Sequence, residues 1–233
     1  MWELTNTEWI AFSLSLKVAF TGVIASLPFG FAVAWLLARK QFPGKIILDG
    51  LVHLPLVVPP VATGYLLLVL LGVNGPVGAW LNEQFGVRLV FTWQGAAIVA
   101  AVMGFPLLVR ALRLSIEAID VGLIQAARTL GASPSRVLIT IVLPLISPGL
   151  IAGSLLAFSR ALGEFGATIA FVGNIPGETQ TLPLALYSAL QSPGAEEMGY
   201  RLVALSIALA IVTLAASELL GRTIRKRLTG NSQ

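Results

Sequence analysis

Residues 125–144, QAARTLGASPSRVLITIVLP, form an amphipathic stretch between two long apolar segments. Gly131 follows a run of helix-forming residues, in the position where a glycine closes a helix with a left-handed turn. Ser133 and Pro134 then suit the N-cap and the first turn of a second helix. Pro144 is expected to end that second helix. The stretch therefore predicts two short helices joined by a tight turn at Gly131.

Each of these two helices is predicted to have one apolar face. In the first helix, from about Val121 to Leu130, apolar residues recur at spacings of three and four: Ile119, Leu123, Ala126 and Leu130. In the second helix the apolar face consists of Val137, Leu138, Ile141 and Val142. The pattern by itself is equally typical of an amphipathic loop that lies on a bilayer.

The stretch resembles the cytoplasmic coupling loop of permease subunits in ATP-binding-cassette (ABC) importers. In that family the pattern is E-A-A, three residues, G, nine residues and I-x-L-P. The residues in register here are Ala126, Ala127, Gly131, Ile141, Leu143 and Pro144. Gln125 stands where the family usually has Glu. The resemblance implies that about residues 117–144, the coupling loop, contact a separate ATPase subunit.

The composition is that of an integral membrane protein, because 56% of the residues are hydrophobic and only 11% are charged. The chain has no cysteine, which excludes disulfides and thiolate metal sites. A formal charge of +4 does not indicate a nucleic-acid partner, because the basic residues stand in loops beside apolar segments. The sequence therefore predicts an all-α protein surrounded by membrane lipid.

Five apolar segments are long enough to cross a membrane, at about residues 18–38, 46–71, 92–109, 148–172 and 202–220. The second is interrupted by HLPLVVPP, whose prolines predict a broken helix that faces the protein interior: Pro55, Pro59 and Pro60. The fourth has small residues at every fourth position, which favours close helix packing: Gly149, Gly153, Ala157 and Ala161. Short helices are also expected within residues 72–91 and, at the surface, over residues 184–190.

The loop charges predict the orientation of the five spans. Three, four and four Lys or Arg residues, eleven in all, belong to loops on one side: Arg39, Lys40, Lys45, Arg110, Arg113, Arg128, Arg136, Arg222, Arg225, Lys226 and Arg227. The opposite loops contain two, Arg88 and Arg201. The positive-inside rule then predicts an external N-terminus and a cytoplasmic coupling loop. A transport domain over residues 10–221 and a basic cytoplasmic tail over residues 222–233 are expected.

Two charged residues, Arg160 and Glu164, fall inside the fourth predicted span, where an unpaired charge is costly. Their four-residue spacing lets them form an ion pair. Two interpretations are open. The pair either only fixes helix packing, or lines a translocation path in which Arg160 attracts an anion and Glu164 holds the guanidinium. The three prolines of the second span belong to the same candidate path.

The segment around this pair, SRALGEFGATIAFVGNIPGET over residues 159–179, resembles permeases for tetrahedral oxyanions. Its GEFGA is shared by sulfate and molybdate systems, whereas NIPGET and HLPLVVPP look most like molybdate permeases. The resemblance implies a type I ABC importer permease fold with five core helices in the inner membrane. It also implies a homodimer, two ATPase subunits and an extracytoplasmic molybdate-binding protein. Sulfate, thiosulfate or tungstate is the alternative cargo.

The sequence offers little chemistry for an enzyme. It has no glycine-rich phosphate loop ending in Lys-Ser or Lys-Thr, so ATP hydrolysis is expected in a partner subunit. The single histidine, His53, is interpreted as a polar residue hydrogen-bonded to Asp49 rather than as a metal ligand. No catalytic residue, cofactor or metal is therefore expected. The alternatives from other classes are a passive anion channel and an intramembrane enzyme using Glu164, Asp49 or Glu218.

Overall fold

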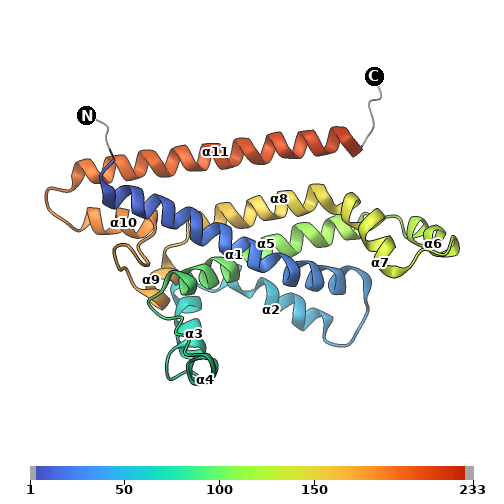
Figure 1. The fold of residues 1–233 in the computed structure, drawn as a ribbon, viewed down its shortest axis with the longest axis horizontal. Helices are drawn as coiled ribbons and strands as arrows, with labels where there is room; N and C mark the ends of the chain where they lie inside the picture. The colour runs from blue at the N-terminus through green and yellow to red at the C-terminus, as the bar shows by residue number, and fades with distance from the viewer. Residues whose placement is uncertain (1–3, 229–233) are drawn as a thin grey trace.

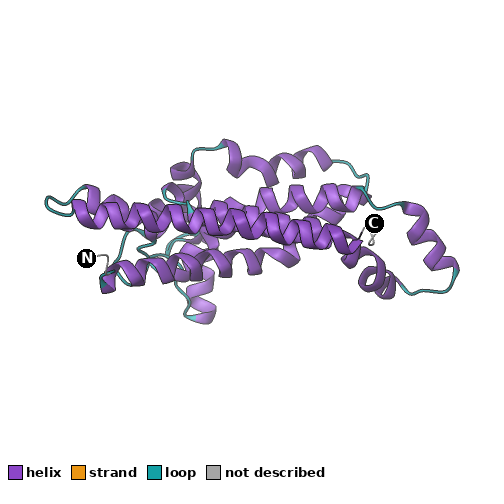
Figure 2. Ribbon diagram, turned by 90° about the horizontal axis from the view of Figure 1, so that it is seen from above, coloured by secondary structure: helices purple, strands orange, loops and turns teal. Residues whose placement is uncertain are grey.

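The computed structural model describes residues 4–228, and within this range every regular element is helical (Figure 1). In chain order these are α1 (Asn6–Arg39), α2 (Lys45–Val57), α3 (Pro60–Leu71), α4 (Pro76–Phe85), α5 (Trp93–Glu117), α6 (Val121–Thr129), α7 (Pro134–Val137), the π-helical η1 (Leu138–Val142), α8 (Leu143–Leu162), α9 (Gly166–Val172), α10 (Leu182–Leu190) and α11 (Glu196–Leu228). Figure 2 shows the same chain without a strand in the described part. The prediction of an all-α protein is confirmed.

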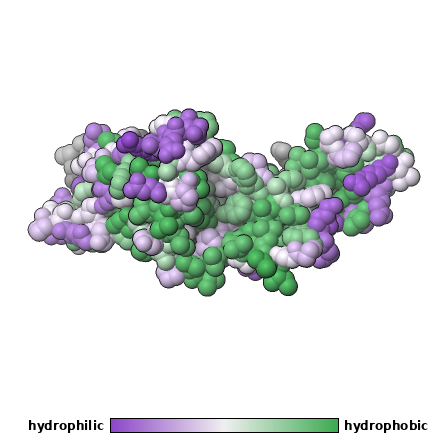
Figure 3. All heavy atoms as spheres, turned by 90° about the horizontal axis from the view of Figure 1, so that it is seen from below, coloured by the Kyte–Doolittle hydropathy of each residue, from purple (hydrophilic) through white to green (hydrophobic). Residues whose placement is uncertain are grey.

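Four helical stretches in the described residues are long and apolar enough to cross a membrane: Asn6–Arg39, Trp93–Glu117, Pro134–Leu162 and Glu196–Ala216. The bent pair formed by α2 and α3 adds a fifth crossing if it is counted as one span. Figure 3 shows apolar residues over the middle of the molecule and hydrophilic residues gathered toward its two ends. This distribution suits a helical bundle whose long axis crosses the bilayer.

The helices extend beyond the apolar segments that predict them. The helix α1 begins twelve positions before residue 18, because Thr5 and Glu8 form a capping box at Asn6. Glu8 is fully buried and also pairs with Arg201 of α11, at 2.8 Å from its Oε1 to the arginine Nε. Hydropathy predicts the part of a helix that lies in the hydrocarbon region of the bilayer. The ends of the helix depend instead on capping residues and on ion pairs such as Glu8–Arg201.

The last helix also exceeds its predicted span. The backbone of α11 continues to Leu228, past the predicted end at residue 220, so the predicted tail is helical as far as the structure describes it. Residues 229–233 lie outside the described residues, and so do the side chains of the four basic tail residues, Arg222, Arg225, Lys226 and Arg227.

Two predicted spans are broken. The second changes direction by 117° between α2 and α3, as its prolines predict. The fourth predicted span, over residues 148–172, is also interrupted and is not one continuous helix. The helix α8 ends at Leu162, Gly163 is its C-cap, and α9 begins at Gly166. Glu164 stabilises the break, because its Oε1 accepts a hydrogen bond from the N–H of Ala167 at 2.8 Å.

The central helix is α5, which packs against α1 and α8. The small residues of α8 face it as predicted: a Cβ on Gly153 would lie 2.9 Å from the Cβ of Ala111, and Gly104 approaches Ala157. The core of this bundle consists of side chains without exposed surface, including Leu108, Leu112, Ile116 and Ile146. The bundle therefore provides a rigid frame for the broken helices and for the coupling loop.

Two short helices complete the fold. The helix α4 is the one expected within residues 72–91. The helix α10 was expected at the surface, but its Leu184 and Ala185 are fully buried. Ala185 belongs to a core cluster with Ala11 of α1 and Leu202 of α11. The reason is a long-range cap, since the N–H of Leu182 donates to the Ser15 hydroxyl at 2.7 Å and fixes the start of α10 against α1.

Candidate functional site

Side-chain caps fix the two helices of the coupling loop. Asp120 caps α6 by accepting a hydrogen bond from the N–H of Gly122 at 2.8 Å. Ser133 caps α7 by accepting from the N–H of Arg136 at 3.4 Å. Between them Gly131 has a φ of +82°, the left-handed conformation that its position predicts. The tight turn between the helices is therefore built as the sequence predicts.

Pro144 does not end the second helix, so that prediction is wrong. The stretch Pro134–Leu162 is helical throughout, with the π-helical segment η1 in the middle. The N–H of Leu143 donates to the carbonyl of Leu138, five residues earlier rather than four. A proline has no N–H and its ring clashes with the carbonyl four residues earlier, and the wider π turn accommodates both effects. The second arm of the loop, from Pro134, is consequently continuous with the membrane-spanning helix that ends at Leu162.

The buried face of α6 differs from the predicted one. Ile124 and Ala127 pack against the core, whereas Leu123 is 51% and Leu130 is 89% exposed. Apolar residues occur on both sides of α6, so their spacing could not decide which side faces the bundle. In the second arm Val137 and Val142 are buried as predicted. The loop therefore combines an anchored second arm with a first arm that exposes large apolar side chains.

The residues that match the importer pattern lie mainly on the exposed surface of this loop. Exposed are Gln125, Ala126, Gly131, Leu143 and Pro144, and partly buried are Ala127 and Ile141. Packing within one chain therefore does not account for most of this pattern.

The two broken helices meet at a second candidate site. Pro60, the first residue of α3, lies against Gly166, the first residue of α9, where an added Cβ would be 2.9 Å from the proline Cβ. A Cβ on Gly64 would similarly lie 2.8 Å from the Cα of Ala167. Such close approach requires glycine at both positions. The contact brings the break in the second span beside the break that contains Glu164.

Arg160 and Glu164 form the predicted ion pair at this junction, with 2.6 Å between Nη1 and Oε2. They do not lie in the middle of a continuous span, because Arg160 is in the last turn of α8 and Glu164 follows its end. The Glu164 side chain is 3% exposed and also caps α9, whereas the Arg160 side chain is 28% exposed. The carboxylate is thus fully engaged, and part of the guanidinium stays accessible.

The remaining path candidates are divided between two places. Pro59 directly precedes Pro60 at the junction. Pro55 instead lines an apolar cavity of about 580 Å³ between α1, α2 and α5, together with Phe29 and Phe105. The structure therefore brings Pro60 against Gly166, two residues after Glu164, with Pro59 adjacent to Pro60 in the chain, whereas Pro55 lies in a different place.

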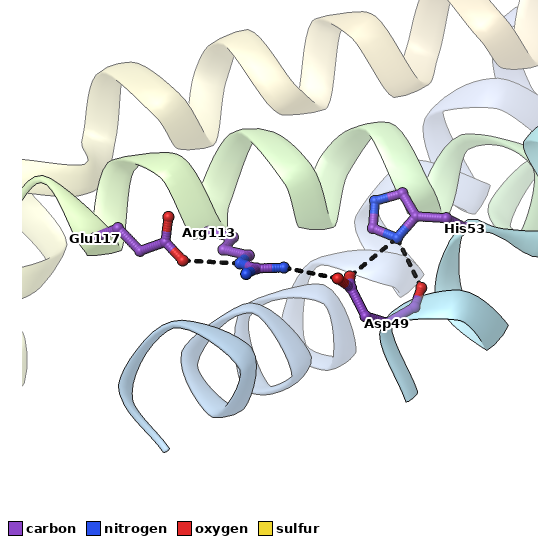
Figure 4. Close-up of polar contacts among 4 residues, drawn as sticks. All are labelled: Asp49, His53, Arg113 and Glu117. Atoms are coloured by element: carbon purple, nitrogen blue, oxygen red, sulfur yellow. Dashed lines mark hydrogen bonds and ion pairs between the residues drawn. The ribbon is translucent and has the colours of Figure 1, made fainter. Parts of the chain in front are cut away.

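A charged network links α2 to the end of α5 that leads into the coupling loop (Figure 4). Arg113 lies between two carboxylates, at 3.0 Å from Asp49 Oδ2 and 2.8 Å from Glu117 Oε1. His53 Nδ1 lies 2.9 Å from the backbone carbonyl oxygen of Asp49, its hydrogen-bond partner, and 3.2 Å from Asp49 Oδ1. The two residues are therefore in contact as predicted, but the hydrogen bond is to the main chain of Asp49. Together with Arg110 they line a cavity of about 540 Å³. Among the described residues no group of His, Asp and Glu could hold a metal ion.

The sequence indicated the His53 contact but not the contact with Arg113. Asp49 and Arg113 are 64 positions apart, and the charge count assigned the arginine to a loop. A charged residue within an apolar segment, as Asp49 is, was the available signal that a partner exists elsewhere.

Residues 15–226 match the family described as "Binding-protein-dependent transport system inner membrane component". The chain belongs to this family. It is 57% identical to the Molybdenum transport system permease protein ModB of Escherichia coli (strain K12), over 96% of this chain and 98% of that protein. It is 56% identical to ModB of Haemophilus influenzae, over 95% and 96%. The Sulfate transport system permease protein CysT of Escherichia coli is 38% identical, over 94% of this chain and 76% of that protein.

Solved importer structures have the same fold at low sequence identity. A bacterial ABC transporter for the import of alginate matches with a TM-score of 0.71 at 19% identity, covering 97% of this chain and 82% of that one. The MetNI methionine ABC transporter, in inward facing conformations, matches with a TM-score of 0.68 at 17% identity, covering 96% and 97%. The predicted type I ABC importer permease fold is confirmed, and the chain is a multi-pass transport subunit.

Proposed function

We propose that this permease is the transmembrane subunit of an ATP-driven molybdate importer. The observation that supports molybdate as the transported ion is the 57% identity to ModB over nearly the whole of both chains. The absence of a phosphate-binding loop from the sequence assigns ATP hydrolysis to a separate ATPase subunit. The second candidate is sulfate, favoured by the 38% identity to CysT; thiosulfate and tungstate have similar tetrahedral chemistry.

The permease works as a homodimer with two ATPase subunits and an extracytoplasmic molybdate-binding protein. Of the thirteen residues of α2 only Val52 is buried within one chain. The same helix exposes Ile46 and Val57 by more than four-fifths, yet it also carries Asp49 and His53. Because charged groups are costly in contact with lipid, a second copy rather than lipid covers the polar side of α2. The exposed Leu123 of α6 and Leu130, the C-cap of this helix, supply an apolar surface for the ATPase.

Residues 10–221 form the transport domain, and its path passes the junction of the broken helices. There the accessible part of the Arg160 guanidinium attracts the oxyanion, with Pro59 and Pro60 opposite. The helical stretch Pro134–Leu162 runs without interruption from the coupling loop to Arg160. Closure of the ATPase dimer on ATP would therefore move the loop and the junction together. The two states of the path, open to either side, are each stabilised by a different ligand.

The experiment is uptake of labelled molybdate into proteoliposomes that contain the permease, with and without the ATPase and the binding protein. We expect uptake only when ATP and both partners are present, and stronger competition by tungstate than by sulfate. Molybdate flux without ATP would instead support a passive channel. A passive channel has no need of a coupling loop, so this outcome would leave the pattern of residues 125–144 unexplained. Faster uptake of sulfate than of molybdate would instead support the second candidate function, sulfate import.

The N-terminus is external, and the coupling loop and the tail from residue 222 are cytoplasmic. The start of α2, the coupling loop and the end of α11 lie at one end of the molecule and the start of α1 at the other (Figure 1), which supports this orientation. A reporter that is active only in the cytoplasm should work after Lys45, Arg136 or Arg227, and fail after Gly86 or Glu196. Activity of the fusion at Glu196 would contradict the five-span topology.

A further inference from the structure

We infer that Arg39 is a positioning residue that fixes the direction in which the coupling loop leaves the membrane bundle. The inference rests on the proposed function in one respect, because coupling to an ATPase is the activity that Arg39 would support. Arg39 is the last residue of α1 and has no part in the importer pattern of residues 125–144.

The Arg39 guanidinium crosses from α1 to the backbone that leads into the coupling loop. Its Nη2 donates to the carbonyl of Ile116 at 2.7 Å and to the carbonyl of Ile119 at 3.0 Å. Ile116 is in the last turn of α5, and Ile119 directly precedes Asp120, the N-cap of α6. One side chain therefore joins the end of α1, the end of α5 and the start of α6.

The two acceptors differ in their other partners. The Ile116 carbonyl also accepts from the N–H of Ile119 at 3.2 Å, whereas the Ile119 carbonyl lies just beyond the end of α5 and accepts from Arg39. Both residues are buried, so a protein donor takes the place of water at these carbonyls. A guanidinium has several N–H groups in a fixed fork and a charge that suits the negative end of a helix, so it can serve two carbonyls at once. The Arg39 Nε is buried without a hydrogen-bond partner among the described residues. The position of Arg39 thus satisfies the two carbonyls but does not satisfy every N–H group of the guanidinium.

Within the chain, α6 is held mainly at its two ends, by the turn at Gly131 that joins it to α7 and by its connection to α5. No residue of α6 is buried, and only Ile124 and Ala127 are partly covered by the bundle. The other arm of the loop is continuous with α8 and is oriented by that span. The first arm is oriented by the turn at Gly131 and by its connection at residues 117–120, and Arg39 holds the second of these.

The test compares Arg39→Gln with Lys40→Gln in the reconstituted complex. Both variants remove one positive charge at the same end of α1, but the Lys40 side chain is exposed and makes no hydrogen bond or ion pair among the described residues, which makes Lys40 a matched control. We expect Arg39→Gln to lower molybdate imported per ATP hydrolysed by about fivefold or more. Lys40→Gln should match the unmodified protein, and Arg39→Lys should recover part of the loss. Equal ratios for Arg39→Gln and Lys40→Gln would overturn the inference.

A second measurement is independent of the cargo. Because the sequence has no cysteine, two spin labels can be attached at cysteines replacing Arg128 in α6 and Leu145 in α8. We expect the distance distribution between them to broaden in Arg39→Gln and to stay unchanged in Lys40→Gln. An unchanged distribution in Arg39→Gln would overturn the inference even in a fully active importer. A broadened distribution in a protein that imports no molybdate would reject the proposed function and retain Arg39 as a positioning residue.

Discussion

Gly131→Val should uncouple the importer while leaving its membrane spans folded. Gly131 has a φ of +82°, and a β-branched residue in this conformation is strained by about 1–3 kcal/mol. An added Cβ would meet no atom within 4 Å, so the strain comes from the backbone alone. Relief of that strain rotates α6 relative to α7. We expect the variant to reach the membrane and dimerise, and to lose at least about tenfold of the uptake and ATPase activity stimulated by loaded binding protein.

Two control variants separate backbone geometry from side-chain chemistry at this loop. Gly131→Asn adds a side chain but tolerates the left-handed conformation, so it should keep most of the activity. Gln125→Glu restores the residue usual in the family and should change stability by well under about 1 kcal/mol. Normal stimulation and uptake with Gly131→Val would show that this loop is not the coupling element.

Arg160→Leu should produce the largest loss of stability among single substitutions at the junction. It leaves the Glu164 carboxylate, which is 3% exposed, without its cation, and breaking a buried pair in this way costs about 3–5 kcal/mol. Combining it with Glu164→Gln should restore most of that stability. The glutamine carries no charge and still offers an oxygen to the N–H of Ala167. The measurement is the thermal unfolding midpoint of the purified protein in detergent.

Transport by the double variant decides between the two interpretations of the pair. If Arg160 attracts the oxyanion, the variant should assemble with the ATPase, retain its thermal midpoint and lose uptake by at least about tenfold. We expect this outcome, because Glu164 is fully engaged whereas the guanidinium is partly accessible. Near-normal uptake would instead assign the pair to helix packing alone.

Contacts between residues far apart in the chain were not predicted from the sequence. Arg113 meets Asp49 across 64 positions, Arg39 meets Ile116 across 77, and Glu8 meets Arg201 across 193. No local pattern specifies such partners, because each depends on how whole helices pack. The charge count treated Arg39, Arg113 and Arg201 only as loop charges, and it therefore missed their contacts.

The sequence by itself determined the membrane class, the apolar helices and the tight turn between the two short helices on either side of Gly131. These follow from properties of neighbouring residues: summed hydropathy, a glycine that permits a left-handed turn at Gly131, the cap at Ser133 and the break before Pro60. Each of these signals acts over a few neighbouring residues, so its effect can be predicted without knowledge of the tertiary contacts.

Only the tertiary structure decided the break after Leu162, the π turn before Pro144 and the exposed face of α6. An apolar segment with a glycine in it is compatible with one helix or two, and the contact between Pro60 and Gly166 is made where the helix is interrupted. A proline is compatible with the end of a helix or with a locally widened turn, and here the helix continues into the packed span α8. Where local preferences allow two answers, the packing of distant segments selects one.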